Sequence, residues 1–199
     1  MTKQIACLVE GHGDVEGVPI IVRRLAQRSE PEVTVHVSAP LRTPKSKLVK
    51  PGELERAVEF VARRIARHGA VLVVIDSDDD CPANLGPALL NRVNQANIGV
   101  AVAVVLAHKE IESWFVAAAN SLAGVAGLLP GLVAPPDPES IRGAKEWLTQ
   151  RMAGNRSYSP TVDQALLSTR FDLESAMAAD SFTKFAREVE RLIREAPNM

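Results

Sequence analysis

The feature that most constrains this chain is the run Ala70-Val71-Leu72-Val73-Val74-Ile75, which contains no polar residue and stops abruptly at Asp76. A short run that is this apolar and this rich in valine is typical of a strand in a parallel sheet that helices cover on both faces. The acidic sequence Asp76-Ser77-Asp78-Asp79-Asp80 follows it directly. The pattern therefore predicts a buried strand that presents carboxylates at its carboxyl end.

Strand and helix patterns alternate on both sides of this run. Residues 5–9, 33–37 and 98–106 are expected as three further strands, each short and apolar. Between the strands, apolar residues recur at helical spacing, for example at Leu54, Val58 and Val61, and a helix is also expected over about 109–120. This alternation predicts an α/β fold with a Rossmann-like, doubly wound, mainly parallel sheet of about four strands.

The last third of the chain differs in kind from the rest. Gly127 to Pro138 is rich in Gly and Pro and is expected to form a loop. Helical patterns near 139–151 and 173–195 flank a stretch, 154–171, that we expect to be irregular. We therefore expect an α/β domain over residues 1–125 and a helical C-terminal extension over residues 126–199, packed on the sheet or on a partner.

Composition limits the classes of function. The 23 basic and 24 acidic residues give a net charge of −1, which argues against a generally basic surface but leaves room for a local basic patch. Cys7 and Cys81 form no CxxC pair, so a reduced, cytoplasmic location is expected. We expect no membrane association, because no apolar run approaches the ~20 residues that span a bilayer. The nucleotide-cradling sequence GxxxxGK[ST] is absent.

Acidic residues follow three of the four expected strands. Glu10 ends the first strand, Asp76 and Asp78 follow the third, and Glu110 and Glu112 come shortly after the fourth. Because parallel strands end at one edge of the sheet, these side chains are expected to converge. Carboxylates in such proximity resist ionising together unless a cation lies between them, and oxygen ligands suit Mg²⁺ or Mn²⁺. The alternative is a solvated turn that caps the next helix.

The segments that carry these acids resemble a known superfamily. Leu8-Val9-Glu10-Gly11, followed by Val73-Val74-Ile75-Asp76-Ser77-Asp78, is similar to the Toprim pattern, in which a glutamate follows the first strand and a DxD pair follows the third. Lys109-Glu110-Ile111-Glu112-Ser113-Trp114-Phe115 resembles the third acidic element of its OLD-like nuclease branch. Residues 158–164 and 170–173 resemble an uncharacterised bacterial family, domain-of-unknown-function family 4276, and this closer resemblance covers nearly the whole chain.

The superfamily resemblance implies a Toprim-like sheet and assigns roles to the acids. Glu10 would be the general acid/base or a metal ligand, and Asp76 and Asp78 would hold Mg²⁺ or Mn²⁺. Asp80, Glu110 and Glu112 are further candidate ligands, and a second metal would sit between the aspartates and one of these glutamates. The resemblance therefore implies a phosphodiester-cleaving site.

Two choices among these residues stay open. On a helix Glu110 and Glu112 would point roughly 200° apart, so both face one site only if the helix starts late. The edge of the apolar face favours Glu110, whereas the resemblance favours Glu112. Asp14 either reaches the metal or caps the helix after the first strand, and Glu16 either reaches it or is a first-turn acid. Gly11 and Lys109 are the other candidate accessory residues.

Basic residues near the expected edge offer phosphate contacts. Arg42, Lys45 and Lys47 lie in the loop before Pro51, and Arg170 lies in the last third of the chain. All four are candidates for binding phosphate, and the alternative for each is a solvated charge with no ligand.

These features together predict a function. We expect a metal-dependent phosphodiester-cleaving enzyme, a nuclease acting on DNA or RNA. By the resemblance alone, it would act in phage defence beside a separate ATPase partner. The alternative is a non-catalytic Toprim-like module that binds metal or nucleic acid and docks on a partner.

Overall fold

A parallel sheet forms the centre of the molecule in the computed structural model, which describes residues 1–199. The strand order is β2-β1-β4-β5, every pair is parallel, and β3 pairs with β1 beyond the end of β2. The strands are β1 (Thr2–Val9), β2 (Thr34–Val37), β3 (Leu41–Arg42), β4 (Ala70–Asp76) and β5 (Ala101–Ala107). The predicted α/β class with a parallel sheet is confirmed, with two-residue β3 as an addition.

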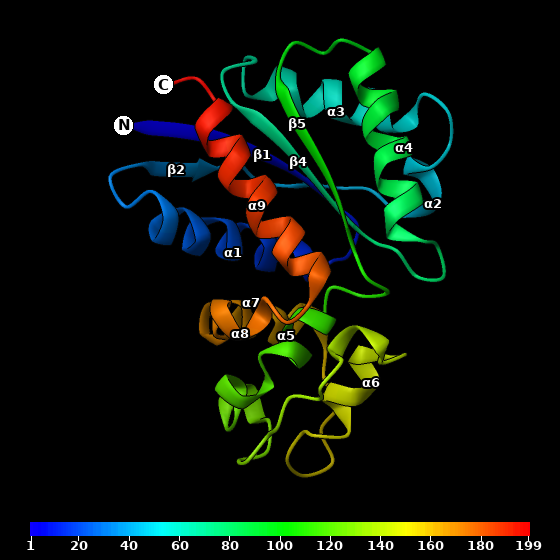
Figure 1. The fold of residues 1–199 in the computed structure, drawn as a ribbon, viewed down its shortest axis with the longest axis vertical. Coiled ribbons are helices and arrows are strands. Elements are labelled where there is room, and N and C mark those ends of the chain that lie inside the picture. The colour runs from blue at the N-terminus through cyan, green and yellow to red at the C-terminus, as the bar shows by residue number, and fades with distance from the viewer.

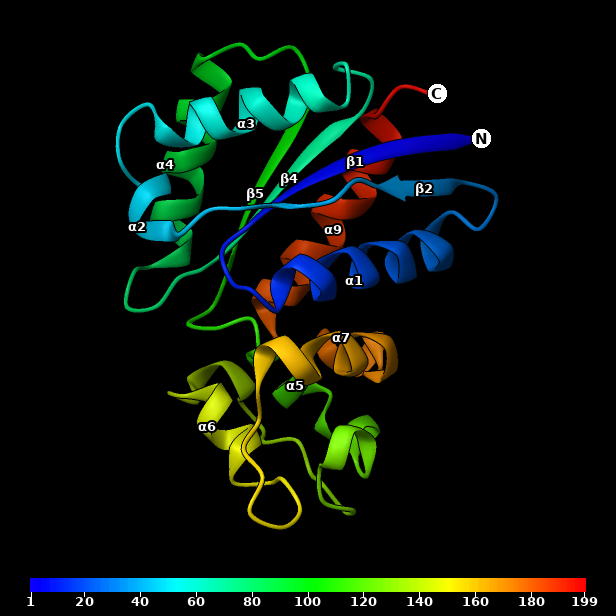
Figure 2. The ribbon, with the colours of Figure 1, turned by 180° about the vertical axis from the view of Figure 1, so that it is seen from behind.

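Helices cover both faces of the sheet, as a parallel sheet requires. On one face lie α1 (Asp14–Ser29) and α9 (Asp180–Glu195), and on the other lie α3 (Glu53–Arg64) and α4 (Pro82–Gln95) (Figures 1 and 2). Successive residues of β4 alternate between the two cores, so that Leu72 belongs to the α1–α9 side and Val73 to the α3–α4 side. The absence of any polar residue in this strand follows from its burial on both faces.

A set of short helices lies beyond the carboxyl ends of β4 and β5, and we call residues 108–179 the helical cap (Figure 1). It contains α5 (Ser113–Ala117), η1 (Ala119–Leu122), η2 (Val125–Gly127), η3 (Pro138–Ser140), α6 (Ala144–Thr149), α7 (Pro160–Arg170) and α8 (Leu173–Ala176). The chain then returns as α9 to the sheet, where it packs on β5, β4 and α1. The division of the chain at residue 125 stays a prediction.

Aromatic rings join the helical cap to α9, the helix that packs on the sheet. The Trp114 ring lies 5.3 Å from Phe182 and 4.8 Å from Phe185 of α9, and Phe171 lies 5.6 Å from Phe182. All four side chains are buried. Because each ring removes a large apolar area from water, this cluster fixes the helical cap against α9.

Several helix boundaries differ from the expectation. The stretch 154–171 is not irregular, because α7 occupies Pro160–Arg170; its buried face carries Asp163, Gln164 and Ser168, and this polarity hid the helical period. The expected helix over 109–120 begins only at Ser113. The expected helix near 139–151 is broken at Gly143, whose φ is 72°.

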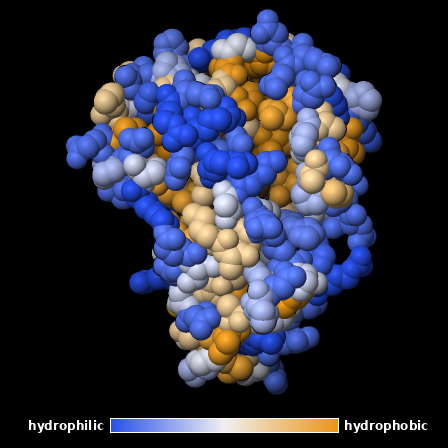
Figure 3. Space-filling model, viewed as in Figure 1, coloured by the Kyte–Doolittle hydropathy of each residue, from blue (hydrophilic) through white to orange (hydrophobic).

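The surface of the α9 face is mainly hydrophilic. Figure 3 shows hydrophilic residues over α9 and over α4, with hydrophobic residues between them where β5 runs along the edge of the sheet. None of the helices combines the length and the apolarity needed to cross a lipid bilayer.

The two ends of the chain lie together at the amino end of β1 (Figures 1 and 2). The backbone N–H of Met199 donates to the carbonyl oxygen of Thr2 at 2.9 Å, so the last residue is fixed beside the first strand. The loops that follow β1, β4 and β5 lie at the opposite edge.

Phe182→Ala tests the role of the aromatic cluster. Phe182 is fully buried, so its truncation leaves a cavity, and we expect the free energy of unfolding to fall by about 3–5 kcal/mol. Urea denaturation measures this loss. The same substitution at Phe60, which is 53% exposed, is the control and should stay within about 0.5 kcal/mol. Equal losses at the two positions would contradict the assignment.

Candidate active site

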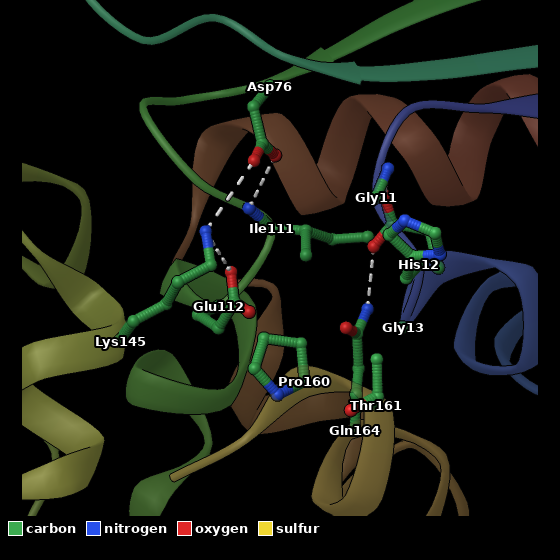
Figure 4. Close-up of a pocket in the computed structure, with 11 residues that line it drawn as sticks. Gly11, His12, Gly13, Asp76, Ile111, Glu112, Lys145, Pro160, Thr161 and Gln164 are labelled. Carbon is green, nitrogen blue, oxygen red and sulfur yellow. Dashed lines mark hydrogen bonds and ion pairs between the residues drawn. The ribbon is translucent and has the colours of Figure 1, made fainter. Parts of the chain in front are cut away.

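A pocket of about 230 Å³ lies where the helical cap meets the carboxyl edge of the sheet. Its walls come from the loop after β1, the end of β4, the loop after β5, α6 and α7 (Figure 4). Only one of its lining residues, Ile111, is hydrophobic, and the side chains that face the pocket include Asp14, Asp76, Glu112, Lys145 and Gln164. A polar pocket at the carboxyl ends of parallel strands is the usual place for a ligand in this class of fold.

Lys145 is surrounded by three carboxylates. Its Nζ lies 3.3 Å from Glu110 Oε1, 3.3 Å from Glu112 Oε2 and 3.8 Å from Asp76 Oδ2. The backbone N–H of Lys145 also donates to Glu110 Oε2 at 3.1 Å. Burial by itself lowers the pKa of Lys145, but the charges of Glu112, Asp76 and Glu110 outweigh it and raise that pKa above its usual value. The ammonium therefore stays charged and compensates the acids.

Glu112 is a buried carboxyl with a different partner at each oxygen. Its Oε1 accepts a hydrogen bond from the Tyr158 hydroxyl at 3.2 Å, whereas its Oε2 makes no hydrogen bond of good geometry and faces the ammonium of Lys145 at 3.3 Å. Burial raises the pKa of Glu112 to about 7, although the charge of Lys145 opposes the rise. Burial also raises the pKa of Tyr158, and the charge of Glu112 raises it further. Tyr158 therefore remains a hydrogen-bond donor to the glutamate.

Asp76 is held at the end of β4 by the loop after β5. Its Oδ1 accepts from the backbone N–H of Ile111 at 2.8 Å, and its Oδ2 faces Lys145. Burial raises the pKa of Asp76 well above its ordinary value, and the negative charge of Glu112 adds to that effect. Asp76 and Glu112 are thus two carboxyls whose ionised forms depend on a nearby cation.

Asp14 closes the other side of the pocket. Its Oδ2 accepts from the backbone N–H of Gly11 at 2.7 Å, and its Oδ1 accepts from Gln164 Nε2 at 2.7 Å. The second bond joins α1 to α7, which approaches so closely that a Cβ placed on Gly13 would lie 2.6 Å from the carbonyl oxygen of Pro160. Asp14 therefore binds the loop after β1 and the helical cap rather than capping α1 with its side chain.

The other predicted acids form a second group around Lys45. Lys45 Nζ lies 2.9 Å from Asp78 Oδ2 and 2.9 Å from Asp80 Oδ2. The Glu10 carboxylate accepts from the backbone N–H groups of Lys45 at 3.1 Å and of Asp76 at 3.3 Å. Burial raises the pKa of Glu10, and these two N–H groups oppose the rise. Glu10 thus links β1, α2 (Lys45–Leu48) and β4 at the sheet edge.

The structure therefore divides the predicted acids into two neighbouring groups. Asp76, Glu110 and Glu112 meet at Lys145, and Asp14 and Gly11 line the same pocket. Both glutamates reach one lysine because α5 begins only after Glu112, which removes the conflict expected on a continuous helix. Glu10, Asp78 and Asp80 gather at Lys45.

Some candidates lie away from both groups. Glu16 is exposed on α1, and Arg170 is exposed at the end of α7. Lys109 Nζ donates to the carbonyl oxygens of Glu139 and Ser140, so it fixes a loop of the helical cap. Arg42 Nη1 donates to the carbonyl oxygen of Glu10 at 3.3 Å, and Lys47 lies 3.7 Å from Glu53.

The predicted set of site residues lacked Lys145 and Gln164, which line the pocket, and Tyr158, which donates to Glu112. Each comes from the helical cap, more than thirty residues after the last predicted acid, and none belongs to a local motif with known chemistry. The sequence held only an indirect signal for Gln164. Gly13 has no side chain, and this permits the close approach of Gln164 to the loop after β1. His12, in the loop after β1, also lines the pocket.

The donor chemistry of the pocket fits a hard divalent cation. Asp14, Asp76 and Glu112 of the pocket and Glu110 beside it offer only oxygen ligands, and Glu112 Oε2 faces only the ammonium of Lys145. In the present arrangement, however, no three acidic, histidine or cysteine side chains converge closely enough to enclose a metal ion. The ammonium of Lys145 lies among the carboxylates instead. Asp76 and Glu112 are the residues that would hold Mg²⁺ or Mn²⁺ if Lys145 moved aside.

Lys145→Met should destabilise the fold more at high pH than at low pH. The variant keeps the length of the side chain but leaves the carboxylates without a counter-ion, which costs most when they are ionised. Because the Lys145 side chain is 36% exposed, we expect about 1–3 kcal/mol at pH 8 and less at pH 5. Thermal melting at both pH values measures this. Arg142→Met, an exposed cation paired with Asp79, is the control.

Glu112→Gln should flatten part of the pH dependence of stability. The folded-state pKa of Glu112 is about 7, above its ordinary value of 4.5, so the folded protein holds this proton more tightly than the unfolded chain. Stability must then decline as pH rises between these two values. Asp76 contributes to the same decline, so we expect the variant to lose only the share that Glu112 causes and to gain on the wild type above pH 7 in urea denaturation. Exposed Glu16→Gln should leave the decline unchanged, and a decline as steep in Glu112→Gln as in the wild type would refute the assignment.

Comparison with known proteins assigns the chain to a family. No curated protein matches the sequence. The family described as "Domain of unknown function (DUF4276)" matches residues 9–190, a span that begins at the end of β1 and includes every pocket residue. The chain therefore belongs to the DUF4276 family, whose description assigns no activity.

Proposed function

We propose that this protein is a Mg²⁺- or Mn²⁺-dependent phosphodiester-cleaving enzyme that acts on DNA or RNA. The observation that carries the proposal is the meeting of Asp76, Glu110 and Glu112 at Lys145, beside a pocket at the carboxyl edge of the sheet that Asp76 and Glu112 line. Burying a carboxyl raises its pKa and lowers the stability of the fold. Carboxyls with raised pKa values are concentrated at catalytic sites. The short Toprim-like motifs supply the reaction class.

Several residues of the pocket have a part in this proposal. A divalent ion bound there would neutralise the phosphate and lower the pKa of a bound water. Asp76 and Glu112 would hold the ion, and Asp14, fixed by Gln164, keeps the loop after β1 in place. Lys145 is the cation nearest to these acids and supplies positive charge to a phosphate oxygen. Pro160 and Thr161 of α7 form one wall of the pocket.

A second candidate function is a non-catalytic module that binds metal or nucleic acid and docks on a partner. It is supported by the two lysines, because Lys145 offsets part of the charge of one group of acids and Lys45 part of the charge of the other without a metal. Under either proposal the place of action is the reducing cytoplasm, since both Cys7 and Cys81 are free thiols. An ATPase partner and a role in phage defence are proposed from the OLD-like resemblance alone.

Calorimetric titration of Mg²⁺ and Mn²⁺ tests the metal site. Asp76→Asn should weaken binding at least tenfold, because this carboxylate lies in the pocket. Asp78→Asn should weaken it less, because Asp78 is 63% exposed and paired with Lys45. Asp79→Asn, 84% exposed, is the control and should leave binding unchanged. A larger effect at Asp78 than at Asp76 would move the proposed site to the Lys45 group.

A cleavage assay then separates the two candidate functions. Single- and double-stranded DNA and RNA are incubated with the wild type, Asp76→Asn and Asp79→Asn in the presence of Mn²⁺. Cleavage that disappears in Asp76→Asn alone supports the enzyme. Metal binding without cleavage of any of these substrates supports the module and refutes the enzyme acting on its own.

A further inference from the structure

A second hollow, of about 420 Å³, lies on the α3 side of the molecule and has no part in the acidic pocket. It runs between the segment that contains β3 and α2 and the side of α3 that carries Arg56 and Phe60. Figure 2 shows α2 and α3 on the same side of the sheet. We call this hollow the α3 groove. Its charged side chains are Arg42, Lys47, Glu53 and Arg56, and Phe60 is its aromatic side chain.

The α3 groove carries an excess of positive charge. Arg42, Lys47 and Arg56 line it, and the only acidic side chain in it is Glu53. Glu53 forms an ion pair with Arg56 and lies 3.7 Å from Lys47, whereas Arg42 is bonded to the carbonyl oxygen of Glu10 and has no carboxylate partner. In a chain whose net charge is −1, such a local excess is the electrostatic pattern of a site for a polyanion.

An exposed aromatic ring lies among these cations. Phe60 is 53% exposed, although the other four phenylalanines of the chain are all fully buried. The buried face of α3 is made by Leu54, Val58 and Val61, so Phe60 contributes little to the core. The guanidinium of Arg64 lies 6.0 Å from the ring centroid. An exposed ring flanked by cations is the arrangement on which nucleobases stack.

The α3 groove ends beside the acidic edge of the sheet. Arg42 donates to the carbonyl oxygen of Glu10, and the carboxylate of Glu10 accepts from the backbone of Lys45 and Asp76. Lys45 follows Thr43 and Pro44, which line the groove. A chain lying in the groove would therefore reach Lys45 and then the residues that follow β4.

We propose that the α3 groove binds a single strand of nucleic acid, with phosphates on Arg42, Lys47 and Arg56 and a base stacked on Phe60. A single strand is favoured over a duplex, because the base faces of a duplex are already stacked on one another and cannot reach the ring. Binding in the groove stands on its own charges and ring. Delivery of the strand to the acidic pocket rests on the function proposed above.

Fluorescence anisotropy with the full chain in EDTA tests binding without any metal. The probes are fluorescein-labelled 12-residue oligothymidylate and oligouridylate at low salt, which also distinguish DNA from RNA. Phe60→Leu, which keeps an apolar side chain but removes the ring, should weaken binding about tenfold, within the range for loss of one stacked base. Phe60→Tyr, which keeps the ring, should bind as the wild type does.

A matched pair of arginines tests the charge. Arg56 and Arg63 are both on α3, both 71% exposed, and both paired with a glutamate one turn earlier, but only Arg56 lines the groove. Arg56→Gln should weaken oligonucleotide binding and reduce the dependence of log affinity on log salt by about 0.7, the value for one phosphate contact on a single strand. Arg63→Gln should change neither quantity.

Three outcomes would overturn the groove proposal. The first is no binding of either oligonucleotide by the wild type at low salt. The second is equal weakening by Arg56→Gln and Arg63→Gln with no effect of Phe60→Leu. The third is tighter binding of a 12-residue oligoglutamate than of both oligonucleotides, which would identify an acidic peptide as the occupant. Metal-free binding that depends on Phe60 and Arg56 supports the groove even if no cleavage occurs, so the two proposals fail separately.

Discussion

The acidic edge of the sheet depends on the ion pairs that the ammonium of Lys145 forms with nearby carboxylates. Three carboxylates, one from the end of β4 and two from the loop after β5, lie within 4 Å of this ammonium, and Glu112 is fully buried. Without a cation between them, these groups would repel one another and take up protons. Lys145 belongs to α6 of the helical cap, whereas Asp76 belongs to the sheet. The same contact therefore balances the charge of the pocket and holds the helical cap against the strands.

The position of Lys145 also defines what the proposed metal ion would have to do on entering the pocket. A divalent cation brings twice the charge of an ammonium to the same oxygens, but it must displace a side chain that is already attracted to them. The apparent free energy of metal binding is then the difference between two favourable terms: the contacts of the metal with the carboxylates, and the contacts of Lys145 that they replace. A polyanionic ligand near the pocket would attract the displaced ammonium and so favour the exchange.

The sequence predicted the sheet and the general place of the acids, and it did so for a clear physical reason. The six apolar residues before Asp76 can be buried only as a central strand, and a strand followed by Asp76 must deliver that side chain at the carboxyl edge. The partition of the acids into two groups was not predictable, because it depends on two lysines that lie far from the acids in sequence. The place of Gln164 was equally difficult to predict, because the buried face of α7 is polar and its apolar residues show only a weak helical period.

Both chain ends lie at the amino edge of β1, as the bond between Met199 and Thr2 shows. β1 has eight residues, so this edge is about 25 Å from the loops that carry the acids. A tag, a fluorophore or a surface linker attached at either end therefore leaves both the pocket and the α3 groove facing the solution. Immobilising the protein through its termini would present every copy with its acidic edge turned away from the support.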